Sequence, residues 1–300
     1  MISNNIKKKI IVGSWSWSGQ YKTIPDKNVH ELIDISLCNG LYEFDTSPTY
    51  GKAETILAKY KRKNNKILIN TKCGWDKDLK KSFEPKSLIE GIDITLEKFE
   101  KINVMQLHNP RNEIQNWDEI IEILNIYKKK KLIKKIGISL ARNFYFPNKI
   151  LNKFDFIQDE FNLLRIDPIY KMRKFKNCLA ARSPFANGIL TSKFNYNSKF
   201  LVTDHRSSWL KDKRLKNICK QKEILEKLSK DKIEKFTMDF IFSFDIFKKV
   251  IFGMRTKKQF NELIKNLSNI KKLKKDQINE IIKINMTNFY FKNSKTKYNN

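Results

Sequence analysis

Long apolar runs are missing from this sequence of 300 residues. None approaches the roughly 20 residues that a helix needs to cross a bilayer. The start of the chain, from Met1 to Lys9, is polar and basic, and only Ile10-Ile11-Val12 follows it. That apolar stretch is shorter than the core of a secretory signal. These absences predict a cytoplasmic protein that does not associate with membranes.

Cysteine is scarce and unpatterned. The four cysteines, Cys38, Cys73, Cys178 and Cys219, match neither a metal-ligand spacing nor a CxxC redox motif. We therefore expect four reduced thiols that pack as small apolar side chains, and no metal site.

Acidic residues are too few to balance the basic ones: 32 against 61, which gives a formal net charge of +29. Such a charge binds polyanions without specificity at low salt. However, the lysines are scattered beside abundant Asn and Ile, as an AT-rich coding bias produces, and no nucleic-acid fold signature occurs. We predict no specific nucleic-acid partner; a steep salt dependence with a sequence or structure preference would revive that hypothesis.

Apolar material is sufficient for a full core, because 40% of the chain is hydrophobic and 12% is aromatic. Segments with strand character alternate with segments of helical period, which is typical of parallel strands joined by crossover helices. The predicted strands cover residues 9–13, 41–44, 67–70, 104–107, 135–139, 154–159, 178–181 and 249–252. The predicted helices cover residues 27–39, 52–60, 86–99, 117–130, 216–228, 235–242, 256–267 and 276–284.

Eight strand–helix units in a chain of this length predict an α/β protein with a (β/α)8 TIM barrel of parallel strands. We expect a single barrel over residues 1–285 and a polar, flexible tail over 286–300. The rival architecture is an open doubly wound sheet, which usually has a glycine-rich turn after its first strand. Here that turn runs from Gly13 to Gly19 as GSWSWSG, which is not GxGxxG.

Titratable side chains follow three successive predicted strands. Asp45 and Tyr50 follow the second strand, Lys72 follows the third and His108 the fourth. Each alone has another explanation: a turn cap, a lysine that reaches the surface, a structural histidine, a half-buried aromatic. Together they meet at one face, because the C-terminal strand ends of a barrel form its active-site rim.

The four residue types form a coherent set for carbonyl reduction. A free tyrosine has a pKa of about 10, and a nearby ammonium lowers it, so we expect Lys72 to lower the pKa of Tyr50. Asp45 supplies the counter-charge that a buried lysine needs. His108 contacts the substrate oxygen, and Tyr50 acts as general acid. The hydride must come from a cofactor, because no side chain donates hydride.

These segments resemble the aldo/keto reductase superfamily. Residues 45–54, DTSPTYGKAE, resemble its Asp-Thr-Ala-x-x-Tyr-Gly-x-Ser-Glu signature. Thr71-Lys72-Cys73-Gly74 and Leu107-His108-Asn109-Pro110 resemble its lysine and histidine strand ends. The resemblance runs from about Ile10 to Asn266 and implies a catalytic set of Asp45, Tyr50, Lys72 and His108.

The resemblance also implies cofactor-binding positions along the chain. Three positions depart from the family pattern: Leu140 replaces an asparagine, Arg182 replaces the tyrosine that stacks on nicotinamide, and Leu263 replaces a second asparagine. A guanidinium also stacks on flat rings, although Arg182 as an ordinary surface residue stays open. The implied residues are Ser14, Trp15, Asp45, Ser139, Gln158, Arg182, Ser183, Pro184, Gly188, Gly253, Met254, Arg255, Gln259 and Glu262.

Cofactor and substrate follow as expectations. In the family, the turn at Gly253-Met254-Arg255 grips the 2′-phosphate of adenosine, so we prefer NADP(H) and leave NAD(H) open. Position alone places Trp17, Trp75 and Asn109 at the substrate mouth; plain packing is an equal alternative for Trp75.

The substrate is expected to be a small polar aldehyde or ketone, with sugars and their derivatives as candidates. We expect a monomer or a small homo-oligomer. The alternative function is a catalytically slow protein of the same fold that senses cofactor or binds a partner.

Overall fold

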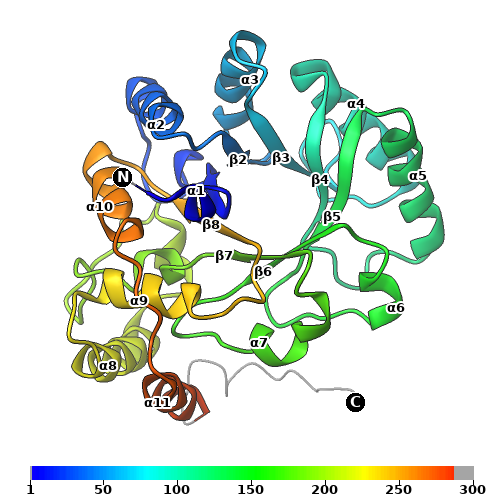
Figure 1. Cartoon of the computed structure of the whole chain (residues 1–300). Coiled ribbons are helices and arrows are strands. Elements are labelled where there is room, and N and C mark those ends of the chain that lie inside the picture. Colours follow the sequence, from blue (N-terminus) through cyan, green and yellow to red (C-terminus); the bar gives the residue numbers. More distant parts are fainter. Residues whose placement is uncertain (1, 287–300) are drawn as a thin grey trace.

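Each predicted strand forms and pairs in parallel with the next along the chain, and β8 returns to β1 to close the barrel (Figure 1). The computed structural model describes residues 2–286. Closure aligns Val12 with Phe252 and Gly13 with Gly253. The strands are β1 Ile10–Gly13, β2 Glu43–Asp45, β3 Leu68–Cys73, β4 Ile102–His108, β5 Ile133–Ser139, β6 Phe156–Glu160, β7 Leu179–Arg182 and β8 Lys249–Gly253.

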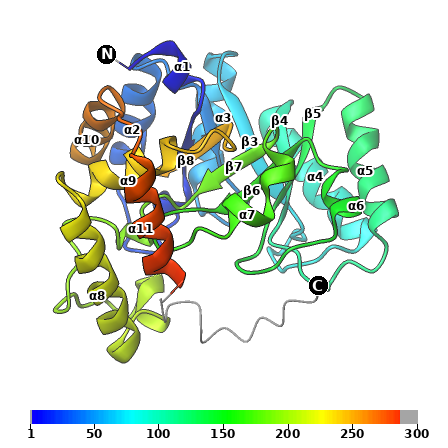
Figure 2. The same cartoon turned by 60° about the horizontal axis from the view of Figure 1, so that its bottom comes forward.

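Helices surround the barrel, and Figures 1 and 2 both place α8, α9, α10 and α11 together on one side of it. The α-helices are α1 Asn4–Lys7, α2 Asp26–Cys38, α3 Ala53–Lys63, α4 Pro85–Phe99, α5 Trp117–Lys129, α6 Asn148–Leu151, α7 Pro168–Lys171, α8 Asp212–Leu228, α9 Ile233–Phe242, α10 Lys257–Leu267 and α11 Lys275–Met286. Short 3-10 helices cover Trp15–Trp17, Arg173–Phe175, Ala186–Gly188 and His205–Ser208.

Helix α4 shows why these segments are helical. Pro85 lies in its first turn, where the missing N–H has no intrahelical role. Its buried residues are Leu88, Ile92, Thr95 and Phe99, a spacing that lines one face of a helix. The apolar face therefore packs on the strands while the charged face meets solvent.

The inside of the barrel is layered. Successive side chains of a strand point to opposite faces, so residues two apart share a face. Five strands contribute to a separate apolar cluster: Ile11, Val104, Phe156, Ala180 and Ile251. Two positions further along the same strands are Gly13, Gln106, Gln158, Arg182 and Gly253. A dry apolar layer thus lies beneath a polar layer at the C-terminal strand ends.

The structure differs from the predicted elements mainly in short segments. Helices α1, α6 and α7 were not predicted, because four residues are too few to show a helical period. The predicted tail 286–300 lies outside the described residues except for Met286, which ends α11. No helix among residues 2–286 is long and apolar enough to span a bilayer.

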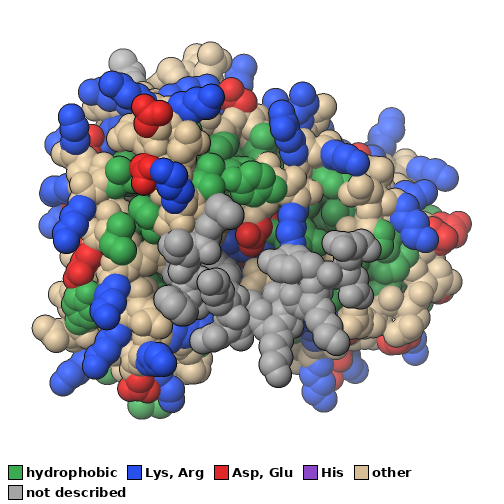
Figure 3. Space-filling view, turned by 90° about the horizontal axis from the view of Figure 1, so that it is seen from below, with side chains coloured by type: hydrophobic (Ala, Val, Ile, Leu, Met, Phe, Trp, Pro, Cys, Tyr) green, Lys and Arg blue, Asp and Glu red, His purple; other side chains and the backbone are tan. Residues whose placement is uncertain are grey.

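Lysine and arginine side chains are spread across the face shown in Figure 3, with acidic side chains between them. This distribution agrees with the scatter of lysines in the sequence. The absence of a specific nucleic-acid partner stays a prediction.

Phe161, directly after β6, provides a test of the packing. It is fully buried, with ring centroids 5.3 Å from Phe240 of α9 and 4.4 Å from Phe247. We expect Phe161→Ala to lower the free energy of unfolding by about 3–5 kcal/mol in urea denaturation, because it leaves a cavity. Val202→Ala is the control, since Val202 is 96% exposed, and should change it by less than about 0.5 kcal/mol. Equal effects would contradict this account of the core.

Candidate active site

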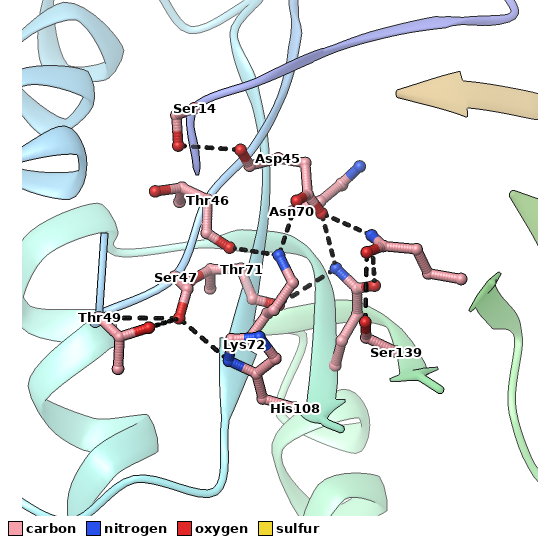
Figure 4. Close-up of polar contacts among 12 residues, drawn as sticks. Ser14, Asp45, Thr46, Ser47, Thr49, Asn70, Thr71, Lys72, His108 and Ser139 are labelled. Atoms are coloured by element: carbon pink, nitrogen blue, oxygen red, sulfur yellow. Dashed lines mark hydrogen bonds and ion pairs between the residues drawn. The ribbon is translucent and has the colours of Figure 1, made fainter. Parts of the chain in front are cut away.

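The strand register brings the predicted catalytic residues to one rim. Asp45 ends β2, Lys72 lies near the end of β3 and His108 ends β4. Lys72 aligns with Gln106 of β4, and His108 aligns with Ser139 at the end of β5. Because all the strands are parallel, these side chains converge, as Figure 4 shows.

Lys72 and Asp45 form a buried ion pair. Lys72 Nζ donates to Asp45 Oδ1 at 2.6 Å and to the Thr46 carbonyl at 2.7 Å. Lys72 is 1% exposed and Asp45 is 4% exposed. The other carboxylate oxygen accepts from the amides of Gln106 and Gln158, at 3.0 and 2.9 Å. A buried pair needs partners for its remaining bonding capacity, and here both carboxylate oxygens and two of the three ammonium hydrogens have them.

Tyr50 follows β2 and lies over the ammonium: Lys72 Nζ is 5.0 Å from its ring centroid, and the His108 ring centroid is 6.0 Å away. The expected lowering of the Tyr50 pKa is wrong as a net effect. Loss of water around the phenol raises the pKa more than Lys72 lowers it. For Lys72, burial acts to lower the pKa, but Asp45 and Tyr50 outweigh it and raise the net value. The pair is therefore a protonated phenol above a charged ammonium.

His108 is held in one neutral tautomer. The indole Nε1 of Trp75 donates to His108 Nδ1 at 2.9 Å, and an indole N–H can only donate. Nδ1 is therefore unprotonated, and Nε2 carries the proton. Burial, followed by Lys72, Arg182 and Lys81, holds the His108 pKa well below its usual range. Trp75 lines the cavity, where the sequence placed it, and also orients the histidine.

A hydrogen-bonded chain continues from the ion pair into the cavity. Ser139 Oγ donates to Gln158 Oε1 at 3.2 Å and lies 3.4 Å from Asn109 Oδ1. Asn109 reaches this position with a left-handed backbone, φ 52°. Leu140, which replaces the asparagine of the family pattern, is fully buried. Asn109 thus places an amide beside Ser139 where Leu140 has none.

Arg182 is not an ordinary surface residue. Its guanidinium donates to the Leu140 carbonyl at 2.8 Å and lies 3.9 Å from Glu160, a carboxylate at the end of β6. Arg142 binds both oxygens of the same carboxylate, at 2.6 and 2.9 Å. Glu160, Arg142 and Gln106 were not among the residues predicted from the sequence. Gln106 had a signal, because it precedes His108 by one strand period.

At the other end of the cavity, Arg255 follows β8. Its backbone N–H donates to Gln259 Oε1 at 2.8 Å, and its guanidinium donates to the Lys22 carbonyl at 2.6 Å. Two guanidinium groups lie near the ring of Tyr21, with Arg255 at 5.9 Å and Arg206 at 4.4 Å from its centroid. Tyr21 and Arg206 were not among the residues predicted from the sequence.

One cavity of about 930 Å³ joins these groups. Two predicted residues lie beneath it: Ser14 is fully buried and bonds the Asp45 carbonyl, and Trp17 is 6% exposed and donates to the Met254 carbonyl. Neither residue lines the cavity, and the cofactor and substrate contacts predicted for them stay predictions. The predicted residues that line the cavity are Trp15, Asp45, Tyr50, Trp75, His108, Asn109, Ser139, Gln158, Arg182, Ser183, Pro184, Gly188, Gly253, Met254, Arg255, Gln259 and Glu262.

Metal chemistry has no cluster to support it in the described part of the chain. No group of three or more His, Cys, Asp or Glu side chains there could hold an ion. All four cysteines are free; Cys73 and Cys219 are buried as expected, whereas Cys38 is exposed.

Comparison with known proteins places this arrangement in context. The profile of the Aldo/keto reductase family matches residues 9–286. A chloroplastic pyridoxal reductase from Arabidopsis thaliana is 24% identical over 240 residues, which cover 65% of this chain and 61% of that relative.

Two solved structures share the fold. A glycerol dehydrogenase from Gluconobacter oxydans has a TM-score of 0.77 at 20% identity. The match covers 96% of this chain and 94% of the dehydrogenase chain. An aldo-keto reductase from Bacillus halodurans has a TM-score of 0.73 at 17% identity, covering 92% and 91%.

Trp75→Phe tests the tautomer of His108. The change removes the indole donor that stabilises the neutral imidazole, so the pKa of His108 should rise. We expect the acidic limb of the kcat/KM profile to move to higher pH and kcat at neutral pH to fall about tenfold. Trp117→Phe is the matched control, since Trp117 packs against Phe146 with a centroid separation of 4.7 Å. An unmoved acidic limb in Trp75→Phe would refute the assignment.

Proposed function

The chain belongs to the aldo/keto reductase family of oxidoreductases, and from that membership we propose that it reduces an aldehyde or ketone to an alcohol, with Tyr50 as the proton donor. One observation carries the proposal: a charged, buried and hydrogen-bonded Lys72–Asp45 pair lies under a protonated tyrosine at the floor of a cavity. Burying this ion pair costs desolvation free energy, and at the rim of a cavity such an arrangement indicates a functional rather than a structural role.

The proposed chemistry follows from the hydrogen bonds. His108 Nε2–H donates to the carbonyl oxygen of the substrate and polarises it. Tyr50 donates its proton to that oxygen as the alkoxide develops. The Lys72 ammonium then stabilises the phenolate, 5.0 Å from the ring centroid, and Asp45 keeps the ammonium charged. A bound nicotinamide cofactor supplies the hydride.

The residues present fit such a cofactor. Arg182 Nε is buried and has no hydrogen-bond partner among residues 2–286, although the residue lines the cavity. Ser139 and Asn109 offer hydroxyl and amide groups for a carboxamide. At the far end, Arg255 precedes the N-terminus of α10, where helix geometry favours phosphate.

We favour NADP(H) over NAD(H) because Arg255 brings a cation to the end of the cavity formed by β8 and α10. Arg255 forms no ion pair with a carboxylate among residues 2–286, whereas Arg206 is bound by Asp204 at 2.6 Å. The substrate is a small polar carbonyl compound, with sugars and their derivatives as candidates. Two similar proteins are named as oxidoreductases of small molecules, one a pyridoxal reductase and the other a glycerol dehydrogenase.

Tyr50→Phe tests the reductase. We expect NADPH to bind wild type and Tyr50→Phe alike in a fluorescence titration, because the ring is kept. Turnover on a panel of small aldehydes should fall by at least about a hundredfold, since only the proton donor is lost. Failure of both NADPH and NADH to bind would overturn the proposal. Tight binding with little turnover by wild type would favour the cofactor-sensing or partner-binding alternative.

Arg255→Met tests the cofactor preference. Removing the guanidinium should raise the Kd of NADPH about tenfold and leave that of NADH unchanged, because only NADPH carries the 2′-phosphate. Arg62→Met, on the exposed end of α3, controls for net charge. An equal loss for both cofactors in Arg255→Met would contradict the assignment of NADP(H).

A further inference from the structure

Two guanidinium groups share one carboxylate beside the catalytic residues. Arg142 engages both oxygens of Glu160, whereas Arg182 lies 3.9 Å from one of them and bonds only a backbone carbonyl at short range. Although burial opposes it, Arg142 leads Arg182 and Arg165 in holding the pKa of Glu160 at about 2. The trio Arg142–Glu160–Arg182 therefore keeps a net charge of +1 at neutral pH.

The charge of Arg182 reaches the reaction centre. Arg182 lines the same cavity as Tyr50 and His108. After larger contributions from burial, Lys72 and, for Tyr50, the opposing charge of Asp45, the positive charge of Arg182 acts to lower the pKa of both side chains. Arg182 thus belongs to the electrostatic environment of the groups that receive the carbonyl oxygen.

Besides Glu160, Asp159 acts on the charge of Arg182, and Arg165 binds that carboxylate at 2.8 Å. Asp45 is neutralised by Lys72 at 2.6 Å, and Glu160 is bound by Arg142 through both oxygens. Two other acids line the cavity. Glu234 accepts hydrogen bonds from the backbone N–H and the hydroxyl of Ser192, and Glu262 lies on α10, at the end of the cavity that holds Arg255. His108 is neutral. The field at Tyr50 and His108 is accordingly positive.

This field matters because a nicotinamide ring is a cation when oxidised and neutral when reduced. Hydride transfer requires the ring to meet the carbonyl carbon, whose oxygen is received by Tyr50 and His108. We propose that Arg182 makes the site select the oxidation state of its cofactor, binding the reduced form more tightly than the oxidised form. The inference rests on the proposed reductase function and adds a property to it.

The selectivity has a functional direction. Repulsion of the oxidised ring speeds release of the spent cofactor and lessens inhibition by it. The same difference in affinity raises the midpoint potential of the bound cofactor, by about 30 mV for each tenfold preference in a two-electron couple. The higher potential makes the bound reduced cofactor a weaker hydride donor, so the advantage for carbonyl reduction lies in faster exchange of the spent cofactor.

The test is the ratio of two dissociation constants, Kd(NADP⁺)/Kd(NADPH), measured by fluorescence and calorimetric titration of the full chain. The phosphates are common to both forms, so their attraction to arginine cancels in the ratio. We expect the wild-type ratio to exceed one, and Arg182→Met to lower it about tenfold, the effect of one charge at short range. Arg182→Lys keeps the charge and should keep most of the ratio.

Arg255→Met is the matched control, because it removes the same group from the other end of the cavity. It should weaken both forms and leave the ratio unchanged. An Arg182→Met ratio equal to that of wild type, with both forms still bound, would overturn the inference and leave the reductase intact. Loss of binding of both forms by the wild-type chain would overturn the reductase and this inference together.

Discussion

The hydrogen-bonded ion pair of Lys72 and Asp45 is the constraint on which the rest of the site depends. A charged lysine that is 1% exposed is unstable without a counter-charge, and that counter-charge needs donors for its second oxygen. Gln106 and Gln158 provide them from β4 and β6. Four strands are therefore tied to one carboxylate, and the position of Tyr50 above the ammonium follows from those ties.

The barrel, and the meeting of Asp45, Tyr50, Lys72 and His108 at one rim, could be predicted from the sequence, because both follow from local patterns. Strand and helix periods alternate, and Asp45, Lys72 and His108 each follow an apolar run. Cavity contacts were harder to predict. Ser14 and Trp17 sit in a loop whose path has no periodic signal, and both turn under the cavity. The pKa of Tyr50 was misjudged because desolvation depends on packing, which one segment does not reveal.

Contacts between distant segments account for the residues that were missed. Glu160 lies at the end of β6, and its partners Arg142 and Arg182 come from the segment after β5 and from β7. Nothing in sequence spacing pairs them; only the strand order of the closed barrel does. Trp75 shows the same principle, since its role depends on a contact with His108 across 33 positions of the chain.

The apolar layer forms a barrier inside the barrel. It consists of Ile11, Val104, Phe156, Ala180 and Ile251. It lies directly beneath the strand positions that hold Gln106, Gln158 and Arg182, so apolar side chains stand between the ion pair and the N-terminal end of the barrel. In the reaction proposed above, the proton that leaves Tyr50 is then replaced from the open mouth of the barrel. In that reaction, reprotonation of Tyr50 is coupled to product departure, because water reaches Tyr50 only after the alcohol has left.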